Sequence, residues 1–390
     1  MSAGPVLYVL ERYPELSQTF VAGEIDELRS RGVAVEVLAL APGTPQPGDG
    51  AAPAVYPADR GPAGRLAALG ALAGRRPRAC ARLVTREAFW PPDGRRARAL
   101  ARIAPFVPRA GAARHLHAHF ADVAADLARV LSLLSGTRFS FSAHATDVFR
   151  DAEAIRANLA GAAFCVTNCE YNRRHLAAVA PEHSGKVTVI GMGVDLRRFR
   201  RRRPYDPDGP VVAVGRLVRK KGFDQLVRAA ARIRGRTVLI AGEGPERGAL
   251  EGLIAETRAP VRLLGALAHG EVRDLVESAS LFALPCMVAP DGDRDGTPVA
   301  ILEAMALEVP VVATEEVGIP EMVDADRGRL VPSGDPDALA AALGLVLGVA
   351  PGGRVAMGRA GRAWVEQNAD RSRQAELLRQ LIEGGRDGAT

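Results

Sequence analysis

Short apolar runs alternate with longer amphipathic segments along almost the whole chain. The run "PVLYVLE" (5–11) precedes the helix-like "SQTFVAGEIDELRSRG" (17–32), which Ser17 can cap at its start and Gly32 can end. Further strand-like runs lie at 33–40, 115–120, 138–144, 163–168 and 186–194, and a second series lies at 210–217, 236–244, 261–267, 280–285, 309–314 and 328–332. Short strands alternating with helices predict an α/β fold whose parallel sheets are covered on both faces.

The chain is expected to divide near residues 197–209. Six of the seven residues at 197–203 are Arg, and three Pro follow between 204 and 210, so 197–209 is predicted to be a linker. We expect two Rossmann-like doubly wound domains, 1–196 and 210–368, and a C-terminal helix at 369–390 that packs back on the first domain. Such sheets bind ligands beyond the carboxyl ends of their strands, so the expected site is a cleft across which the two sheets face each other.

Basic residues are unevenly distributed. The formal net charge is +6, and the chain contains only three Lys, at 186, 220 and 221. The segment Arg60–Arg114 contains thirteen Arg and two acidic residues, so it carries +11 while the rest of the chain carries −5. The segment is either a solvated helix face or a docking surface for anionic lipid or an anionic acceptor. Nucleic acid is not an expected partner, because the Arg clusters are not interleaved with aromatic residues that stack on bases.

The remaining composition favours a cytoplasmic protein. Cys80, Cys165, Cys169 and Cys286 follow no zinc spacing, and Cys165 and Cys169 are interpreted as buried thiols. The opening "MSAGPVLYVLERYPE" reaches charged residues after one short apolar run, unlike a signal peptide. No uninterrupted 18-residue apolar stretch occurs. Peripheral attachment to the inner face of the plasma membrane is expected if Arg60–Arg114 docks there.

Two cations follow the first predicted strand of the second domain. In "VAVGRLVRKKGF", a turn at Gly215 leads to Arg216 and Lys221. A guanidinium fork and a compact ammonium at such a turn suit a diphosphate, and a retained Lys in an Arg-rich chain favours this interpretation. The turn "IAGEGPERGAL", with Gly242 and Gly244, can bring backbone close to a ligand. The alternative is that both cations are ordinary surface residues.

The stretch "DGDRDGTPVAILEAMALEVPVVAT" (291–314) contains a second candidate site. Gly296, Thr297 and Pro298 begin a predicted helix, whose free N–H groups can bind phosphate or sugar oxygens. Asp295 precedes that turn, and Glu303 has four apolar residues on either side. Because a buried carboxylate without partners is costly, Glu303 is expected to accept hydrogen bonds from the two hydroxyls of a ribose. The alternative is an ordinary Glu on a helix surface.

Histidines gather in "HLHAHF", where His115, His117 and His119 share one strand face. This spacing can form a metal site, but no acidic or cysteine ligand is near in the sequence, so no metal is expected. His119, at the strand end, is a candidate for the acceptor side of the cleft. Ordinary packing is the alternative for all three.

Several of these segments together resemble the family 4 glycosyltransferases, which have the GT-B fold. The resemblance rests on "GRLVRKKG", "LIAGEGPERGAL", "VRLLGAL…HGEVRDLVESASLFALP" and "DGTPVAILEAMALEVPVVAT…GIPEMV…GRLVPSGDPDALAAAL", and it extends over about residues 5–375. Members of this family typically have two Glu separated by seven residues; here Glu303 matches the second, and Asp295 stands at the first. The segments "ERYPELSQTF" and "DGDRDGTP" are most similar to the branch that builds exopolysaccharides such as colanic acid.

The resemblance implies a role for each matching residue. Arg216 and Lys221 would hold the diphosphate, Glu303 would bind the ribose, and His144 in "SFSAHATDVF" would lie near the donor sugar. It implies catalytic roles for His144, Arg216, Lys221 and Asp295, donor binding by Gly215, Gly242, Gly244, Gly296, Thr297, Pro298 and Glu303, and an acceptor side that includes Ser17, Gln18, Thr19, His119 and Asp147.

The implied activity is that of a hexosyltransferase. It would move a sugar from a UDP- or GDP-type donor to a hydroxyl acceptor, retain the anomeric configuration, and need no metal or cofactor, because Arg and Lys balance the diphosphate charge. A lipid-linked or polysaccharide intermediate is the expected acceptor. The alternatives are transfer to a soluble natural product such as an aminocyclitol, a GT-B sugar-nucleotide epimerase, and a basic protein that docks on membrane or nucleic acid without chemistry.

Overall fold

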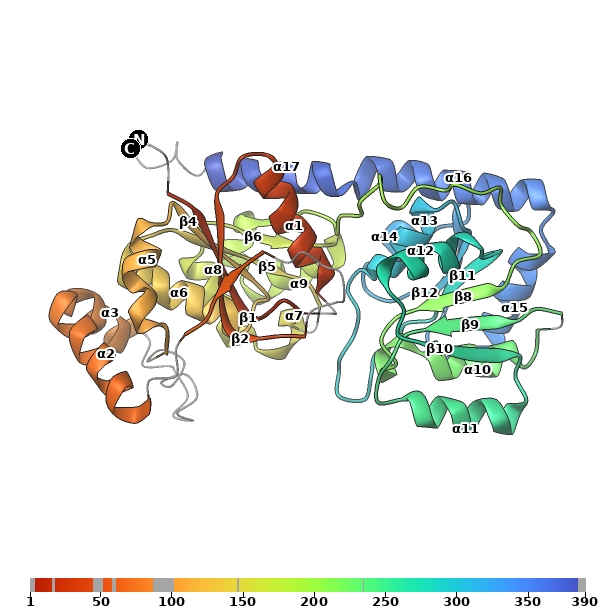
Figure 1. Cartoon of the computed structure of the whole chain (residues 1–390), viewed down its shortest axis with the longest axis horizontal. Coiled ribbons are helices and arrows are strands. Elements are labelled where there is room, and N and C mark those ends of the chain that lie inside the picture. The colour runs from red at the N-terminus through yellow and green to blue at the C-terminus, as the bar shows by residue number, and fades with distance from the viewer. Residues whose placement is uncertain are drawn as a thin grey trace. The chain divides into compact units, whose positions relative to one another are not determined.

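The computed structural model describes residues 4–15, 18–44, 52–57, 61–86, 102–145, 147–233 and 235–384, which form two compact α/β units (Figure 1). Unit 1 takes in Met1–Thr167, Arg173–Ile190 and Ala375–Thr390, and unit 2 takes in Asn168–Asn172 and Gly191–Gln374. Each unit contains one parallel sheet, as the alternation of strands and helices predicts.

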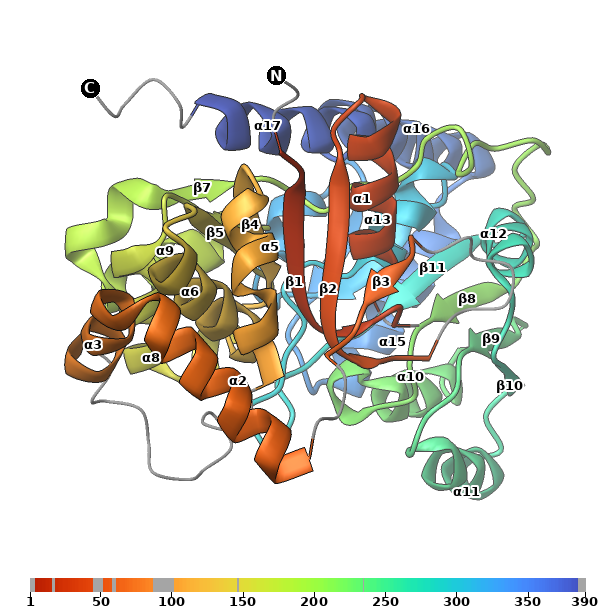
Figure 2. The same ribbon diagram turned by 60° about the vertical axis from the view of Figure 1, so that its left-hand side comes forward.

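The sheet of unit 1 has seven parallel strands in the order β3-β2-β1-β4-β5-β6-β7. Figure 2 shows β3, β2, β1 and β4 side by side. The order reverses between β1 and β4, which defines a topological switch point. The strands are β1 (Val6–Tyr13), β2 (Val35–Pro42), β3 (Ala54–Val55), β4 (His115–His119), β5 (Phe139–Ala143), β6 (Cys165–Thr167) and β7 (Val187–Val189).

Alternating side chains bury both faces of this sheet. On β1, Leu7 and Val9 belong to one apolar cluster, whereas Val6 and Tyr8 belong to another on the opposite face. The first cluster includes α6, and the second includes α1 and the C-terminal helix α17. The helices are α1 (Thr19–Ser30), α2 (Gly61–Arg75), α3 (Pro77–Arg86), α5 (Val107–Ala112), α6 (Val123–Ser135), α7 (Asp147–Arg150), α8 (Ala152–Gly161), α9 (Glu170–Val179) and α17 (Arg371–Gly384), with 3-10 turns η1 (Ala104–Phe106) and η2 (Pro181–Lys186).

The sheet of unit 2 has six parallel strands in the order β10-β9-β8-β11-β12-β13, with its switch point between β8 and β11. The strands are β8 (Val211–Val214), β9 (Val238–Ala241), β10 (Val261–Gly265), β11 (Leu281–Leu284), β12 (Val311–Thr314) and β13 (Gly328–Val331). The helices are η3 (Arg219–Lys221), α10 (Phe223–Ala230), α11 (Arg247–Thr257), α12 (His269–Glu277), α13 (Val299–Ala306), α14 (Ile319–Met322), α15 (Pro336–Gly348) and α16 (Pro351–Asn368).

The division between the units follows Ile190, earlier than the boundary expected at 196/197. Backbone pairing explains the difference: the Val194 N–H donates to the Ala369 carbonyl at 2.8 Å, and the Arg371 N–H donates to the Val194 carbonyl at 3.0 Å. The predicted linker is also anchored, because Phe199 is only 3% exposed and Arg201 donates to the Leu307 carbonyl at 2.7 Å. The Arg-rich segment is therefore part of unit 2.

The structure contains every strand predicted from the sequence, and β3 is an additional edge strand. Cys165 and Cys169 are buried and free, as predicted. Within the described residues, no single helix is long and apolar enough to cross a membrane, and α15 and α16 reach that length and composition only as a pair bent by 110°.

Candidate active site

The turns after β8 and β9 pack backbone against backbone. A Cβ on Gly242 would lie 1.8 Å from the Gly215 carbonyl oxygen, and a Cβ on Gly244 would lie 2.4 Å from the Leu217 carbonyl oxygen. The Gly215 N–H also donates to the Ala241 carbonyl at 3.0 Å. Glycine is therefore required here because two turns of the protein approach each other. This packing fixes where the chain leaves β8.

The segment leaving β8 places two lysines beside the acidic loop that follows β11. Lys221 Nζ lies 2.6 Å from Asp295 Oδ2, while Lys220 Nζ lies 3.0 Å from Asp293 Oδ1 and 3.4 Å from Asp295 Oδ1. Gly222, with a φ of 65°, allows this approach, because a Cβ there would lie 1.9 Å from the carbonyl oxygen of Pro285. Lys221 and Asp295, both predicted site residues, thus form a direct ion pair at the switch point of the second sheet.

The charges in this network support one another. Burial alone would raise the pKa of the Asp295 carboxyl, but Lys221 and Lys220 outweigh that effect and hold the pKa at about 2. Burial alone would lower the pKa of Lys221, but Asp295 raises it instead. Asp295 is therefore ionised and Lys221 protonated at neutral pH. The Cys286 thiol lies 3.6 Å from Asp295 Oδ2, and burial raises its pKa, so it stays protonated.

Two of the charged residues predicted for the site, Arg216 and Glu303 of unit 2, have no ion pair in the described part of the chain. Arg216 is exposed and has no ion pair within the described residues; it is near enough to Lys221 to act on that residue's pKa. Glu303 lies on α13, is partly buried, and forms no side-chain hydrogen bond or salt bridge in the described part of the chain. Burial raises the pKa of Glu303 to about 7, opposed by the charges of Arg371 and Arg198. Its carboxylate can therefore accept hydrogen bonds from a ligand.

The turn before α13 is hydrogen-bonded to the loop that follows β12. Pro298 is the N-cap residue of α13, and the carbonyl of Gly296 accepts a hydrogen bond from the Gly318 N–H at 3.0 Å. A Cβ on Gly318 would lie 2.9 Å from Thr297 Oγ1, so the Thr297 hydroxyl faces that loop. The Gly296 carbonyl is thus held by the loop after β12, and Thr297 and Pro298 follow it into α13.

In unit 1, the predicted histidines form part of a buried polar layer on one face of the sheet. The registers His117↔Ser140 and His119↔Ser142 place the hydroxyls of β5 beside the imidazoles of β4. Ser140 Oγ lies 2.7 Å from His115 Nε2 and 2.8 Å from His117 Nδ1, and Ser142 Oγ lies 3.0 Å from His117 Nε2. Burial is the main cause that lowers the pKa of His117 and of His115, the latter to about 3.

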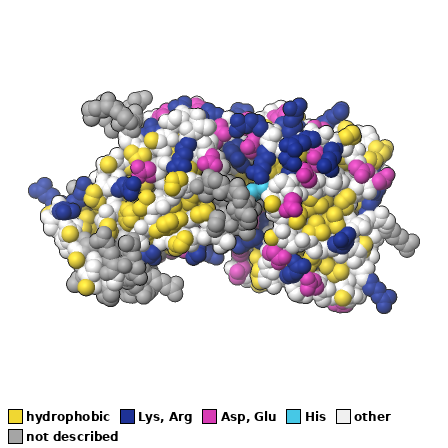
Figure 3. All heavy atoms as spheres, in the orientation of Figure 1, with side chains coloured by type: hydrophobic (Ala, Val, Ile, Leu, Met, Phe, Trp, Pro, Cys, Tyr) yellow, Lys and Arg dark blue, Asp and Glu magenta, His cyan; other side chains and the backbone are white. Residues whose placement is uncertain are grey.

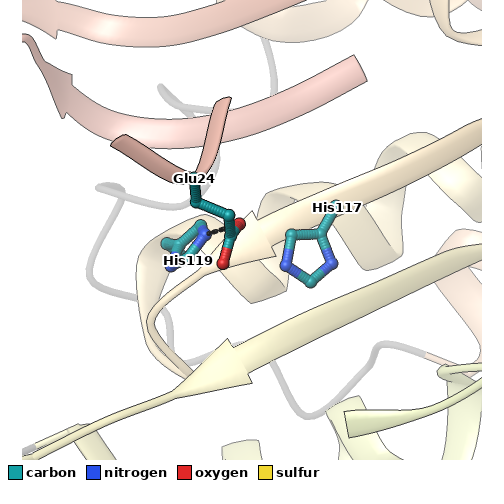
Figure 4. A group of neighbouring side chains, drawn as sticks. All are labelled: Glu24, His117 and His119. Carbon is teal, nitrogen blue, oxygen red and sulfur yellow. Dashed lines mark hydrogen bonds and ion pairs between the residues drawn. The ribbon is translucent and has the colours of Figure 1, made fainter. Parts of the chain in front are cut away.

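His119 belongs to a second chain of contacts in this layer. Its Nε2 lies 2.9 Å from Glu24 Oε1, and its Nδ1 lies 2.9 Å from His144 Nε2, so it joins α1 to the loop after β5. Figure 4 shows the Glu24 carboxylate between the rings of His119 and His117. Ligand atoms of these three residues lie within 4.8 Å of one another, a spacing that a metal ion can use. The ring nitrogens of His117 and His119 already have hydrogen-bond partners, and a metal would have to replace them.

Asp147 fixes the loop that carries His144. Its carboxylate accepts hydrogen bonds from the backbone N–H groups of Ala121 at 2.9 Å, Ala145 at 2.8 Å and His144 at 3.2 Å. Asp147 is 6% exposed, and burial raises its pKa although the N–H groups oppose that effect. The structure thus gives this carboxylate a role in holding two strand-end loops together.

The start of α1 lies beside the same histidines. Thr19 begins the helix, Gln18 is its N-cap residue, and Ser17 lies outside the described residues. The ring of Phe20 packs edge-on against His144, with centroids 5.1 Å apart. Phe20, the residue after Thr19, therefore brings the start of α1 against His144.

Sequence reasoning missed three polar participants. Lys220 is not among the predicted site residues, although both it and Lys221 pair with Asp295. Glu24 and Tyr8 were not considered, yet the Tyr8 hydroxyl donates to Glu24 Oε1 at 2.6 Å. A local sequence signal exists only for the serine hydroxyls of this layer, because the alternation "FSFSA" in β5 places them opposite "HLHAH".

Part of unit 2 is similar in sequence to known glycosyltransferases. The sequence model of the family Glycosyl transferases group 1 matches residues 209–348, which form most of unit 2. A putative colanic acid biosynthesis glycosyltransferase of Salmonella typhimurium is 38% identical over 167 residues, or 40% of this chain and 41% of the relative. A GDP-mannose-dependent monoacylated alpha-(1-6)-phosphatidylinositol monomannoside mannosyltransferase of Corynebacterium glutamicum is 32% identical over 208 residues, or 49% of this chain and 54% of the relative. These matches span about half the length of the relatives or less.

Solved structures define the fold of the whole chain. The Anabaena protein HepE, solved in complex with UDP, superposes with a TM-score of 0.74 over 97% of this chain and all of that chain, at 16% identity. The chain therefore has the GT-B fold, as predicted. The match of the family model within unit 2 agrees with the resemblance seen in the sequence.

Proposed function

We propose that this protein is a retaining, metal-independent glycosyltransferase that moves a sugar from a nucleotide-diphosphate donor to a hydroxyl acceptor. The group 1 domain and the named glycosyltransferase relatives support the general class. The acceptor is a lipid-linked or polysaccharide intermediate, in keeping with the colanic acid and phosphatidylinositol mannoside relatives.

One observation carries this proposal: the loops at the switch point of the second sheet place Lys221 with Asp295, beside an available Arg216. A departing nucleoside diphosphate develops negative charge, and a fixed ammonium and guanidinium stabilise that charge without a metal. Glu303, whose carboxylate has no hydrogen-bond partner among the described residues, is the ribose acceptor on the same unit. His144 contributes the donor-sugar contact from unit 1.

The proposal predicts selective stabilisation by nucleotides. UDP or GDP at a hundred times its Kd should stabilise the folded protein by about 2.7 kcal/mol, measured as a rise in Tm, and EDTA should not abolish the effect. A screen of nucleotide sugars with an exopolysaccharide or lipid-linked acceptor should then give a product with the donor's anomeric configuration, determined by NMR. Stabilisation by neither nucleotide would contradict a nucleotide-diphosphate donor. Inversion at the anomeric carbon would contradict a retaining reaction, and strict dependence on a divalent metal would contradict metal independence.

We also propose that part of Arg60–Arg114 docks on an anionic membrane. The structure limits which arginines are available: Arg76 donates to the Leu134 and Ser135 carbonyls, Arg109 pairs with Glu36 at 2.6 Å, and Arg114 lies 3.6 Å from Glu383. Arg75 and Arg78 are exposed around the α2–α3 junction. Figure 3 shows dark-blue and hydrophobic side chains together at this end of unit 1. Arg60 and residues 87–101 of the segment lie outside the described part of the chain.

Vesicle co-sedimentation tests this docking. The wild type should bind anionic but not neutral vesicles at low salt and be released at about 1 M salt, where the Debye length falls to about 3 Å. The double variant Arg75→Ser/Arg78→Ser should bind more weakly, because each basic residue near the surface contributes roughly 1 kcal/mol. The control Arg228→Ser/Arg262→Ser removes the same charge from exposed positions of unit 2 and should bind normally. Equal loss in both double variants would show a net-charge effect and refute docking through α2 and α3.

A further inference from the structure

The polar layer of unit 1 contains two separate hydrogen-bonded groups. The serines of β5 link His115 and His117, whereas the line Glu24–His119–His144 leads from α1 to the loop after β5. His119 is fully buried and His144 is 8% exposed, while the Glu24 side chain is 25% exposed. The titratable groups facing His119 are Tyr8 on β1, Glu24 on α1, His117 on β4 and His144. The second group therefore connects a partly accessible carboxylate to a predicted site histidine.

The protons in this line can be assigned from donor and acceptor chemistry. Burial alone would raise the pKa of Glu24, but His119, His117 and the Tyr8 hydroxyl outweigh it and hold the pKa at about 2, so the carboxylate only accepts hydrogen bonds. His119 must then carry hydrogen on Nε2. Whenever His119 is neutral, its Nδ1 carries a lone pair, and the 2.9 Å contact with His144 then requires that His144 donates from its own Nε2. His144 is left with an acceptor nitrogen at Nδ1.

We propose that Glu24 is a positioning residue: acting through His119, it fixes His144 in the neutral tautomer that carries hydrogen on Nε2 and presents Nδ1 as a hydrogen-bond acceptor. In that form His144 can accept a hydrogen bond from a sugar hydroxyl but cannot donate one from Nδ1. In proteins generally, a residue that hydrogen-bonds one nitrogen of an imidazole determines which nitrogen carries the hydrogen. The consequence for sugar transfer rests on the proposed function; the proton arrangement does not.

The geometry also predicts how substitutions of Glu24 behave. Tyr8 and His119 both donate to the same oxygen, Oε1, so an amide oxygen can accept both bonds if Tyr8 keeps it in place. Glu24→Gln should therefore preserve the tautomer of His144. Glu24→Ala removes the acceptor and lets His119 carry its hydrogen on either nitrogen, so His144 should populate both tautomers.

Nitrogen-15 NMR of histidine-labelled protein near pH 8.5 tests the proposal directly, because each tautomer has distinct Nδ1 and Nε2 signals. The chain has seven histidines, and the spectrum of His144→Gln identifies the His144 signals by their loss. The wild type and Glu24→Gln should show the Nε2–H tautomer at His144, and Glu24→Ala should show a mixture. The proposal would be overturned if His144 carried its hydrogen on Nδ1 in the wild type, or if its signals were unchanged in Glu24→Ala. The wild-type spectrum remains a test even if Glu24→Ala does not fold.

Activity supplies a second readout and a matched control. Glu24→Ala should lower kcat about tenfold or more, the effect of one lost hydrogen bond, while the Kd for the nucleotide stays unchanged because its residues lie in unit 2. Ser140→Ala removes equally buried hydrogen bonds to His115 and His117, so it should lower Tm yet leave the His144 signals in place. Altered His144 signals in Ser140→Ala would indicate general loosening of the layer and contradict a specific relay. If the wild type transfers no sugar, the proposed function fails, and the spectra still decide the relay.

Discussion

Replacing Lys221 with Ala should lower the rate of sugar transfer about a hundredfold or more. A preorganised charge at a leaving group contributes roughly 3 kcal/mol to transition-state stabilisation, and each 1.4 kcal/mol changes the rate about tenfold. The structure adds a second reason, because Lys221 lies 2.6 Å from Asp295 and holds that carboxylate in the site. Without Lys221, Asp295 would retain only Lys220 as its ion-pair partner among the described residues. Steady-state kinetics with a saturating donor measure the effect.

Lys220→Ala is the matched control for this experiment. The two lysines are adjacent and similarly buried, but Lys220 pairs first with Asp293, at 3.0 Å, and reaches Asp295 only at 3.4 Å. Its loss should therefore reduce the rate much less than loss of Lys221. Normal turnover in Lys221→Ala would remove this residue from the catalytic site. An equal loss in both variants would show that the whole charge network matters, rather than one ammonium group.

Nucleotide-sugar binding should strengthen as the pH rises through about 7, and Glu303→Gln should remove that dependence. The pKa of Glu303 is raised to about 7 because the carboxyl is desolvated. Below that value the group is protonated and accepts only weaker hydrogen bonds to an uncharged oxygen; above it, the carboxylate accepts stronger, charge-assisted bonds from both hydroxyls. The pH-dependent gain therefore appears on the alkaline side. At pH 8, Glu303→Gln should weaken binding by about 1.4–2.8 kcal/mol, or ten- to a hundredfold in Kd.

Calorimetry at pH 6 and pH 8 checks this prediction, and a nucleotide sugar is the better ligand because its diester phosphates do not titrate in that range. A 2′,3′-dideoxy nucleotide serves as the control, since it lacks the two hydroxyls and should bind the wild type and Glu303→Gln about equally. If Glu303→Gln retained the full preference for the ribose, the ribose would have to contact another residue. A persistent pH step in that variant would assign the titration to a different group.

Part of this site could be predicted from local sequence alone. Lys221 stands out because the chain has only three Lys, and Glu303 stands out because its neighbours are apolar. Lys221 follows the predicted strand 210–217, and Glu303 lies in the helix between the predicted strands 280–285 and 309–314. Since parallel strands place their carboxyl ends at the same edge of a sheet, predicting the strands was enough to predict the edge that carries these residues.

The partners of those residues could not be predicted in the same way. Lys220 and Asp293 are 73 positions apart, and Glu24 and His119 are 95 positions apart. Arg76 belongs to the basic segment considered for docking, but it donates to carbonyls at the end of α6. Each of these pairings depends on which helices and strands pack side by side in the fold. The spacing of residues within one segment does not determine that packing.

By itself, the sequence determined that this protein is built from parallel α/β sheets. It also placed Lys221 and Glu303 in the connections that follow two of the strands. Hydrophobic periodicity and glycine turns are local properties, so they can be read one segment at a time. Only the tertiary structure decided that Glu24 is joined to His144 through His119, and that Asp295 is held by two lysines. Strand order and register set those contacts, because they bring side chains from distant segments within hydrogen-bonding distance in a buried layer where a polar group must find a partner.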